Sequence, residues 1–188
     1  MPLTRDQLAA NAEVAEHLGW HFDLELAFDP DEPAWFSVDG AERFRRIGRD
    51  GAGGWFAQLS DSGRVLYASS EGAAGILAAD LDAFVQLLVA CPYWHDVLKY
   101  SRNGNLDEMR RAAAALEADA RDDDELSDAR SLLKTQLGLD EPADPIGALH
   151  HAISAADVVI RAPDGDPCVS LFGRFTIDDN PMLRTAAD

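Results

Sequence analysis

The sequence predicts an α+β protein on the strength of three observations. Two short apolar runs, Trp55–Leu59 and residues 64–68, flank a loop that contains Gly63, which is typical of a β-hairpin. An apolar stripe at helical spacing follows this hairpin and stops at Pro92. After Tyr100 the sequence becomes strongly helical. We therefore expect a helix whose apolar face lies on a sheet, with an extra helical region in the C-terminal half.

The N-terminal residues predict a helix followed by a strand. Thr4 and Gln7 have the spacing of a capping box, and apolar residues recur at helical spacing until Gly19, where we expect the helix to end. In residues 22–28 apolar and acidic side chains largely alternate, which is the period of a strand with one solvated face. The proline-containing run at residues 29–33 should end this strand.

The central helix is predicted from its apolar stripe. A turn at residues 69–72 leads from the hairpin to this helix. The stripe consists of Leu77, Leu81, Phe84, Val85 and Leu88.

Capping residues divide the C-terminal helical region into three helices. Asn105 caps the first, Ser127 can cap a second that Gly138 ends, and Asp144 followed by Pro145 begins the third. A second hairpin is expected at about residues 157–175, where two apolar runs bracket a turn rich in proline and aspartate. With the helical elaboration at about 105–156, these elements fit a single domain over residues 1–188.

The charge of the chain limits its partners. There are 34 Asp and Glu residues against 16 Lys and Arg residues, a formal net charge of −18. Nucleic-acid binders normally carry the opposite sign, since Lys and Arg neutralise the phosphates, so we expect no direct nucleic-acid partner. The acids are mostly Asp and the bases almost all Arg in an Ala-rich chain, so compositional background and function both remain open as causes of the acidity.

The sequence also predicts a cytoplasmic protein with no membrane partner. No apolar run approaches the roughly 20 residues that span a bilayer. The first residues contain acids and no apolar segment of the secretory type.

Several patterns that suggest catalysis or ligand binding favour a structural interpretation. The glycine-rich run at residues 50–54 precedes a strand, whereas a phosphate-binding loop needs a following helix, so these glycines are expected to permit positive φ and close backbone approach. No serine lies in a nucleophile elbow. We therefore expect no enzyme activity, no catalytic residue and no cofactor, although a small-ligand cleft beside the loop that ends at Trp55 remains a third possibility.

Histidine and cysteine pairs at helical spacing are also interpreted as structural. His17 and His21 are four residues apart, but Gly19 is expected to end the helix between them, and Pro92 interrupts the similar spacing of Cys91 and His95. We expect no metal site. The two cysteines, Cys91 and Cys168, are expected to be reduced, buried thiols because each lies in an apolar setting.

The most concentrated charge lies at residues 119–128, where six acids accompany the single Arg121. One interpretation is a solvated loop between helices. The other is an acidic face that steers a basic protein partner. In that case the partner-binding residues are Asp119, Asp122, Asp123, Asp124, Glu125 and Asp128.

The segment between about residues 35 and 100 shows a family pattern of glycine and apolar positions. Its features are a glycine-rich entry at 50–54, an aromatic strand at Trp55 and Phe56, a second strand at 65–67, the run 70–72 (Ser-Glu-Gly), and a helix with Leu81, Phe84 and Leu88. This pattern resembles the SUKH superfamily, which includes fungal cell-wall-synthesis regulators and many bacterial immunity proteins.

The resemblance implies a twisted, mostly antiparallel sheet packed against helices. For a bacterial protein it also implies an immunity protein that binds and neutralises a cognate toxin domain, often a nuclease, by stoichiometric protein–protein interaction. The partner would be a basic toxin. The fungal relatives imply an alternative, a non-catalytic regulatory or scaffolding module that binds other proteins. No contact residue is implied, because the binding surface in this superfamily varies with the toxin.

Overall fold

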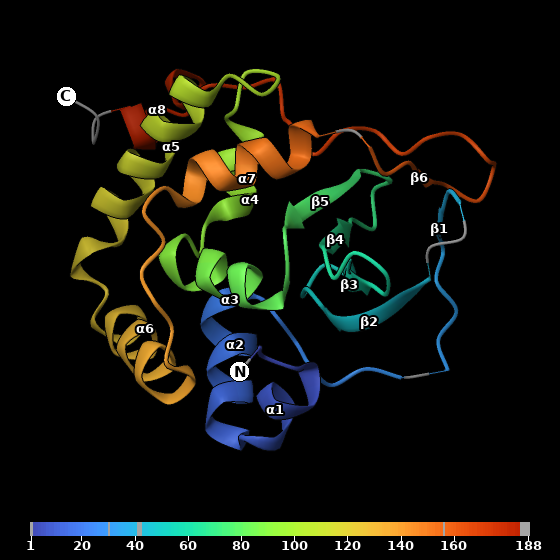
Figure 1. Cartoon of the computed structure of the whole chain (residues 1–188). Coiled ribbons are helices and arrows are strands. Elements are labelled where there is room, and N and C mark those ends of the chain that lie inside the picture. Colours follow the sequence, from blue (N-terminus) through green and yellow to red (C-terminus); the bar gives the residue numbers. More distant parts are fainter. Residues whose placement is uncertain (1, 30, 41–42, 156, 185–188) are drawn as a thin grey trace.

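The computed structural model describes residues 2–29, 31–40, 43–155 and 157–184. A four-stranded sheet is covered by helices on one face and by extended chain with a short two-stranded ribbon on the other (Figure 1). The strands of the larger sheet run antiparallel in the order β2-β3-β4-β5. The predicted α+β class, with a mostly antiparallel sheet packed against helices, is confirmed.

The four strands include the predicted hairpin and two strands, the first and the last of the sheet, that the apolar pattern does not predict. They are β2 Phe44–Arg49, β3 Trp55–Leu59, β4 Val65–Ala68 and β5 Ala74–Ala78. Strands β3 and β4 form the hairpin, in which Phe56 pairs with Tyr67. The assignment of Leu77 to the central helix is wrong, because Leu77 lies in β5 and the helix begins only after Asp80, whose carboxylate accepts the N–H of Ala83 at 2.8 Å.

The side chains of the sheet alternate between two apolar cores. Phe56 and Tyr67 face the helices and pack with Phe84 of the central helix. Trp55 faces the opposite side, where it packs with Phe36 of the extended outer layer. Both faces of the sheet are therefore buried, which explains why the four residues of β4 are all buried.

In Figure 1 the helices lie mostly to the left of the sheet and extend above and below it. In the described part of the chain they are α1 Arg5–Ala10, α2 Ala12–Phe22, α3 Leu81–Ala90, α4 Trp94–Lys99, α5 Leu106–Asp119, α6 Asp124–Leu137, α7 Pro145–Ser154 and α8 Pro181–Arg184. Two 3-10 turns, η1 Ala120–Asp122 and η2 Ile177–Asp179, accompany them. None of these helices has the length and apolar character needed to cross a membrane.

The predicted N-terminal helix is divided into α1 and α2 at Asn11, which ends the first and caps the second. The second helix extends further than predicted, and the strand after it does not form. The capping box of Thr4 and Gln7 is present, but α2 continues through Gly19 to Phe22 and ends where Asp23 adopts a left-handed backbone with φ 53°. The next residues run extended, and a single bridge between Glu25 and Arg49 connects them to β2. Left-handed Asp is uncommon but tolerated, so the helix does not need the glycine as its stop.

The caps of the C-terminal helices are confirmed with one exception. Asn105 caps α5, Gly138 ends α6 in a left-handed conformation, and Asp144 caps α7. Ser127 does not cap α6. It lies inside the helix, and the cap is Asp123, whose carboxylate accepts the N–H of Leu126 at 2.9 Å.

The outer layer contains the ribbon of β1 (Ser37–Val38) and β6 (Ile160–Arg161). The predicted second hairpin forms only in part: its first arm includes β6, and the N–H of Cys168 donates to this strand at 2.8 Å. The arm expected at 169–172 leaves the hairpin, because Val169 instead forms a parallel bridge with Ala73 beside β5.

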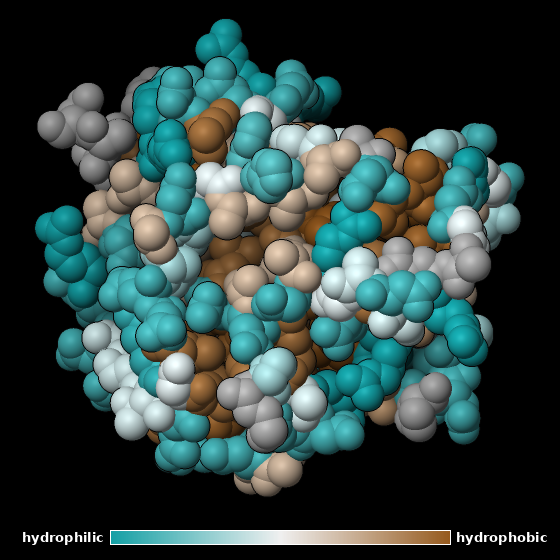
Figure 2. Space-filling model, viewed as in Figure 1, coloured by the Kyte–Doolittle hydropathy of each residue, from teal (hydrophilic) through white to brown (hydrophobic). Residues whose placement is uncertain are grey.

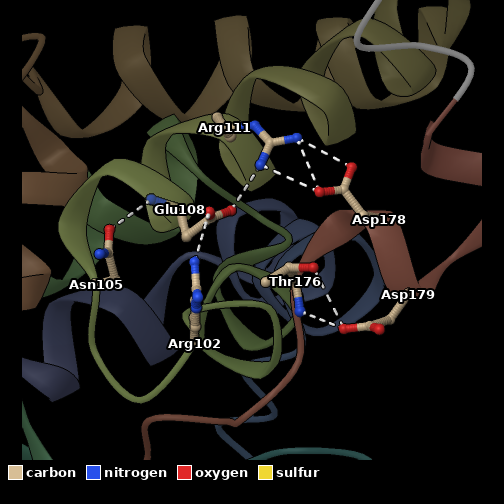
Figure 3. Close-up of polar contacts among 7 residues, drawn as sticks. All are labelled: Arg102, Asn105, Glu108, Arg111, Thr176, Asp178 and Asp179. Carbon is tan, nitrogen blue, oxygen red and sulfur yellow. Dashed lines mark hydrogen bonds and ion pairs between the residues drawn. The ribbon is translucent and has the colours of Figure 1, made fainter.

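Ion pairs attach the last described segment to α5 (Figure 3). Arg111 pairs with Asp178 at 3.1 Å and with Glu108, three residues before it on α5, at 2.9 Å. Ile177 of the neighbouring η2 turn is fully buried. The C-terminal segment therefore contributes both charge pairing and apolar packing to the helical side of the molecule.

Candidate functional site

The six predicted partner-binding acids lie at the corner between α5 and α6, and all six are exposed. We call residues 119–128 the acidic corner. The prediction of a loop there is wrong in part, since Asp119 ends α5, Asp122 lies in η1, and α6 already begins at Asp124. The corner is thus a tight turn between two helices with its carboxylates directed to solvent.

The carboxylates of the acidic corner differ in their bonding. Asp123 caps α6, and the negative charges in the first turn of α6 stabilise the positive end of its dipole. The other five carboxylates form no hydrogen bond or ion pair with another described residue. Several exposed acids elsewhere are paired with arginines, as in Asp157 with Arg64 at 2.8 Å. The corner therefore keeps a local excess of uncompensated negative charge.

A cavity of about 430 Å³ opens beside the glycine-rich loop at residues 50–54, where the sequence left a small-ligand cleft open. The loop, the turn between β4 and β5, and α4 contribute its walls. The polar groups at its centre are Asp23, Asp50, Tyr67 and His95, which we call the Asp50 cluster.

Asp50 is the buried centre of this cluster, with 2% of its surface exposed. One carboxylate oxygen accepts the N–H groups of Ala52 at 3.0 Å and Gly54 at 2.6 Å. The hydroxyl of Tyr67 donates to the other oxygen at 2.5 Å. Burial and this bond to Asp50 raise the pKa of Tyr67 far above its usual value, so the phenol remains a donor.

The glycines of the loop are explained by this arrangement. A Cβ atom at Gly54 would lie 2.5 Å from the hydroxyl oxygen of Tyr67 and 2.7 Å from Oδ2 of Asp50, and Gly53 has a φ of 89°. The expected close backbone approach and positive φ are confirmed. The glycines allow backbone N–H groups of the loop to donate to the carboxylate of Asp50, where a phosphate-binding loop would hold a bound anion.

His95 lies over the other side of the cluster, on α4. Its Nε2 atom is buried, has no hydrogen-bond partner among the described residues, and lies 3.9 Å from Oδ2 of Asp50. Burial lowers the pKa of His95 to about 4, although the neighbouring Asp50 and Asp96 act in the opposite direction. The imidazole is therefore neutral at neutral pH.

Asp23 completes the cluster from the end of α2. The N–H of Gly51 donates to its Oδ1 atom at 2.8 Å. Burial of the carboxylate raises the pKa of Asp23, the bond from Gly51 lowers it, and the charges of Asp50 and Glu25 raise it further. Donor atoms of Asp23, Asp50 and His95 all lie within 4.8 Å of one another, and within the described ranges no other trio of His, Cys, Asp and Glu comes as close.

The structure corrects two of the expectations for the histidine and cysteine pairs. His17 and His21 share one face of the uninterrupted α2, with ring centroids 5.5 Å apart, so the expectation that the helix ends between them is wrong. Cys91 is buried, and burial raises its pKa to about 12. Cys168 is only half-buried, which corrects the prediction of a buried thiol there. The sequence spacing connects His95 only with Cys91, whereas the proximity of His95 to Asp50 comes from the fold.

A second hollow lies between β5, α3 and α7, with a volume of about 390 Å³. Figure 2 shows brown, apolar residues gathered there at the centre of the view, surrounded by teal residues. Arg64 lies at its edge but is already paired with Asp157. The hollow therefore offers mainly apolar surface to a ligand, and the charge of Arg64 at its edge is already neutralised by Asp157.

Comparison with known proteins does not assign the chain to a family. No family model matches it, and no curated protein or solved structure is similar to it. The fold and the two sites define an acidic α+β protein with an exposed acidic corner and a buried carboxylate-histidine cluster.

Proposed function

We propose that this protein is an immunity factor that binds a basic toxin domain and neutralises it as a stoichiometric complex. The observation that supports the proposal most directly is the acidic corner, where five exposed carboxylates have no partner within the described residues. The resemblance to the SUKH superfamily supports the same class of function from the residues at about 35–100.

Charge complementarity gives the physical reason for this partner. The net charge of −18 surrounds the protein with a negative potential, and the unpaired carboxylates concentrate it at one corner. Such a field accelerates encounter with a basic surface and disfavours acidic competitors. A toxin that binds nucleic acid presents a basic cleft, which an acidic surface can occupy in place of phosphates.

The decisive experiment is co-expression with the toxin domain encoded by the neighbouring gene. We expect growth rescue and a stable complex of equal stoichiometry. The proposal is overturned if no neighbouring gene encodes a toxin and co-expression rescues no growth. Recovery of a cellular complex instead, from a gene placed among housekeeping genes, identifies the alternative, a regulatory or scaffolding module.

Two variants of equal charge change test the acidic corner itself. The first carries Asp119→Asn, Asp122→Asn, Glu125→Gln and Asp128→Asn, which leaves the cap Asp123 intact. The control carries the same changes at the exposed residues Glu16, Asp31, Asp61 and Asp140. We expect the first variant to bind the toxin at least about tenfold more weakly at low salt and the control to bind nearly as the parent does. Equal, salt-insensitive binding by both variants would remove the corner from the interface.

A further inference from the structure

We propose that Asp23, Asp50 and His95 form a binding site for a divalent transition-metal ion of the Zn²⁺ or Mn²⁺ class. The site is distinct from the acidic corner and does not depend on the proposed immunity function. Three separate elements supply the donors: the end of α2, the entry to β3, and α4.

The first argument is geometry. Nε2 of His95 and Oδ2 of Asp50 are 3.9 Å apart, and all three donor atoms lie within 4.8 Å. In tetrahedral coordination, donors bound at about 2.0–2.2 Å to one ion are separated by roughly 3.3–3.6 Å. To share one coordination shell, Nε2 of His95 and Oδ2 of Asp50 must approach by about 0.3 Å, and any wider gap, of up to about 1.2 Å, involves the exposed Asp23 side chain.

The second argument is an unsatisfied polar atom. Nε2 of His95 is buried and unpartnered, although it lies beside a carboxylate. A buried polar atom without a partner is costly, and in native proteins such an atom is usually satisfied by a protein group, a water molecule or an ion. An imidazole nitrogen that carries no proton presents a lone pair to a metal ion, and Nε2 lies on the side of the ring that faces Asp50.

The third argument is uncompensated charge. Donor oxygens of Asp23 and Asp50 lie within 4.8 Å of each other, and neither carboxylate is paired with an arginine or lysine in the part of the chain that the structure describes. Lys99 lines the same cavity, but it pairs with Asp96. A divalent cation would balance both carboxylates.

The fourth argument is that both carboxylates are already oriented. Backbone N–H groups of the glycine-rich loop hold Oδ1 of Asp23 and Oδ1 of Asp50, and Tyr67 holds Oδ2 of Asp50. Outer contacts of this kind fix the ligands of metal sites. Tyr67 is therefore a positioning residue, not a ligand.

The donor set selects the class of ion. One imidazole nitrogen with two carboxylates suits Zn²⁺ or Mn²⁺, whereas Ca²⁺ prefers 6–8 oxygen ligands and Mg²⁺ retains several waters. A coordination position left open would face the cavity of about 430 Å³ and take water there.

The test is titration of the full chain, stripped with a chelator, with ZnCl₂, MnCl₂ and MgCl₂ by calorimetry. We expect one site per chain for Zn²⁺ or Mn²⁺ and little heat with Mg²⁺. Asp23→Asn and His95→Gln should each weaken binding at least about tenfold, and Tyr67→Phe should weaken it roughly 10–100-fold. Substitution of Co²⁺ should give a visible absorption band that His95→Gln removes.

The matched control removes the other histidine pair of the chain. In His17→Gln/His21→Gln, whose rings stack on α2, affinity should stay unchanged. Loss of binding in this control but not in Asp23→Asn would overturn the proposal, as would the absence of any binding by the parent chain. Asp23 is exposed, so Asp23→Asn decides the outcome even if His95→Gln fails to fold.

Discussion

Asp50 shows how one residue can organise a loop. Its carboxylate is buried, and three donors from Ala52, Gly54 and Tyr67 replace the water it loses. The two backbone donors, from Ala52 and Gly54, depend on the loop passing close to the carboxylate. The glycines at this point are thus required by a single acidic side chain.

Replacement of Gly54 tests this requirement. Gly54→Ala should lower the free energy of unfolding by about 1–3 kcal/mol, because the new methyl group overlaps Tyr67 and Asp50. Urea denaturation measures the change. Gly19→Ala is the contrasting control: this glycine lies inside α2 with space around it, so alanine should stabilise the protein by about 0.5–1 kcal/mol. Equal effects at both glycines would contradict this account of the loop.

At the scale of elements, the beginning of α6 depends on one capping residue. The cap is Asp123, whereas the sequence pattern assigns it to Ser127. Asp123→Ala should cost about 0.5–2 kcal/mol of unfolding free energy, since it leaves the N–H of Leu126 unpaired. Ser127→Ala lies inside the helix and should cost little. Thermal unfolding of the two variants compares them directly, and a larger loss for Ser127→Ala would show that the helix begins later.

The packing of the sheet gives a second prediction at this scale. Phe84→Ala and Trp55→Ala remove buried rings from the two opposite faces of the sheet and should each cost about 3–5 kcal/mol. Trp20→Ala is the matched control, because this tryptophan is 80% exposed and its loss should change stability little. Urea midpoints of the three variants give the comparison. A small effect of Trp55→Ala would mean that the outer layer does not bury that face.

At the scale of the whole molecule, long-range ion pairs determine the response to acid. Hydrogen bonds from Arg161, Arg130 and Arg64 lower the pKa of Asp39, Glu117 and Asp157 respectively. The unfolded chain binds protons at these groups first as the pH falls, so the stability they contribute is present above about pH 4.5 and is lost below it. The contribution of Asp23 to stability changes with pH in the opposite direction. Because its pKa is raised in the folded state, the folded chain binds this proton more tightly than the unfolded chain does.

Glu117→Gln should therefore flatten the decrease in melting temperature between pH 5 and 3, because it removes one group that must be protonated. Melting curves across this range measure the effect, with Glu16→Gln as the control on an exposed residue. The same slope in Glu117→Gln and in the parent chain would contradict this assignment.

The fold was more predictable than the site. The β3 and β4 hairpin and the caps Asn105 and Asp144 follow from local patterns, because turn and cap residues act within a few positions of the chain. Strand β5 does not follow from its local pattern, since a short apolar run is ambiguous between strand and helix. The Asp50 cluster could not be predicted, because its donors come from residues 23, 50 and 95, and only tertiary packing brings them together.

The pairing of β1 with β6 has a consequence for how the chain folds. It joins segments far apart in sequence, as the bond between Arg161 and Asp39 across 122 positions shows. Until residues 158–168 leave the ribosome, the outer apolar face of the sheet around Trp55 and Leu66 has only part of its cover. Pairings of such high sequence separation form late and slowly, and uncovered strands of this kind are prone to aggregate. The nascent chain is therefore vulnerable until residues 158–168 can pair with β1, the interval in which a chaperone would protect it.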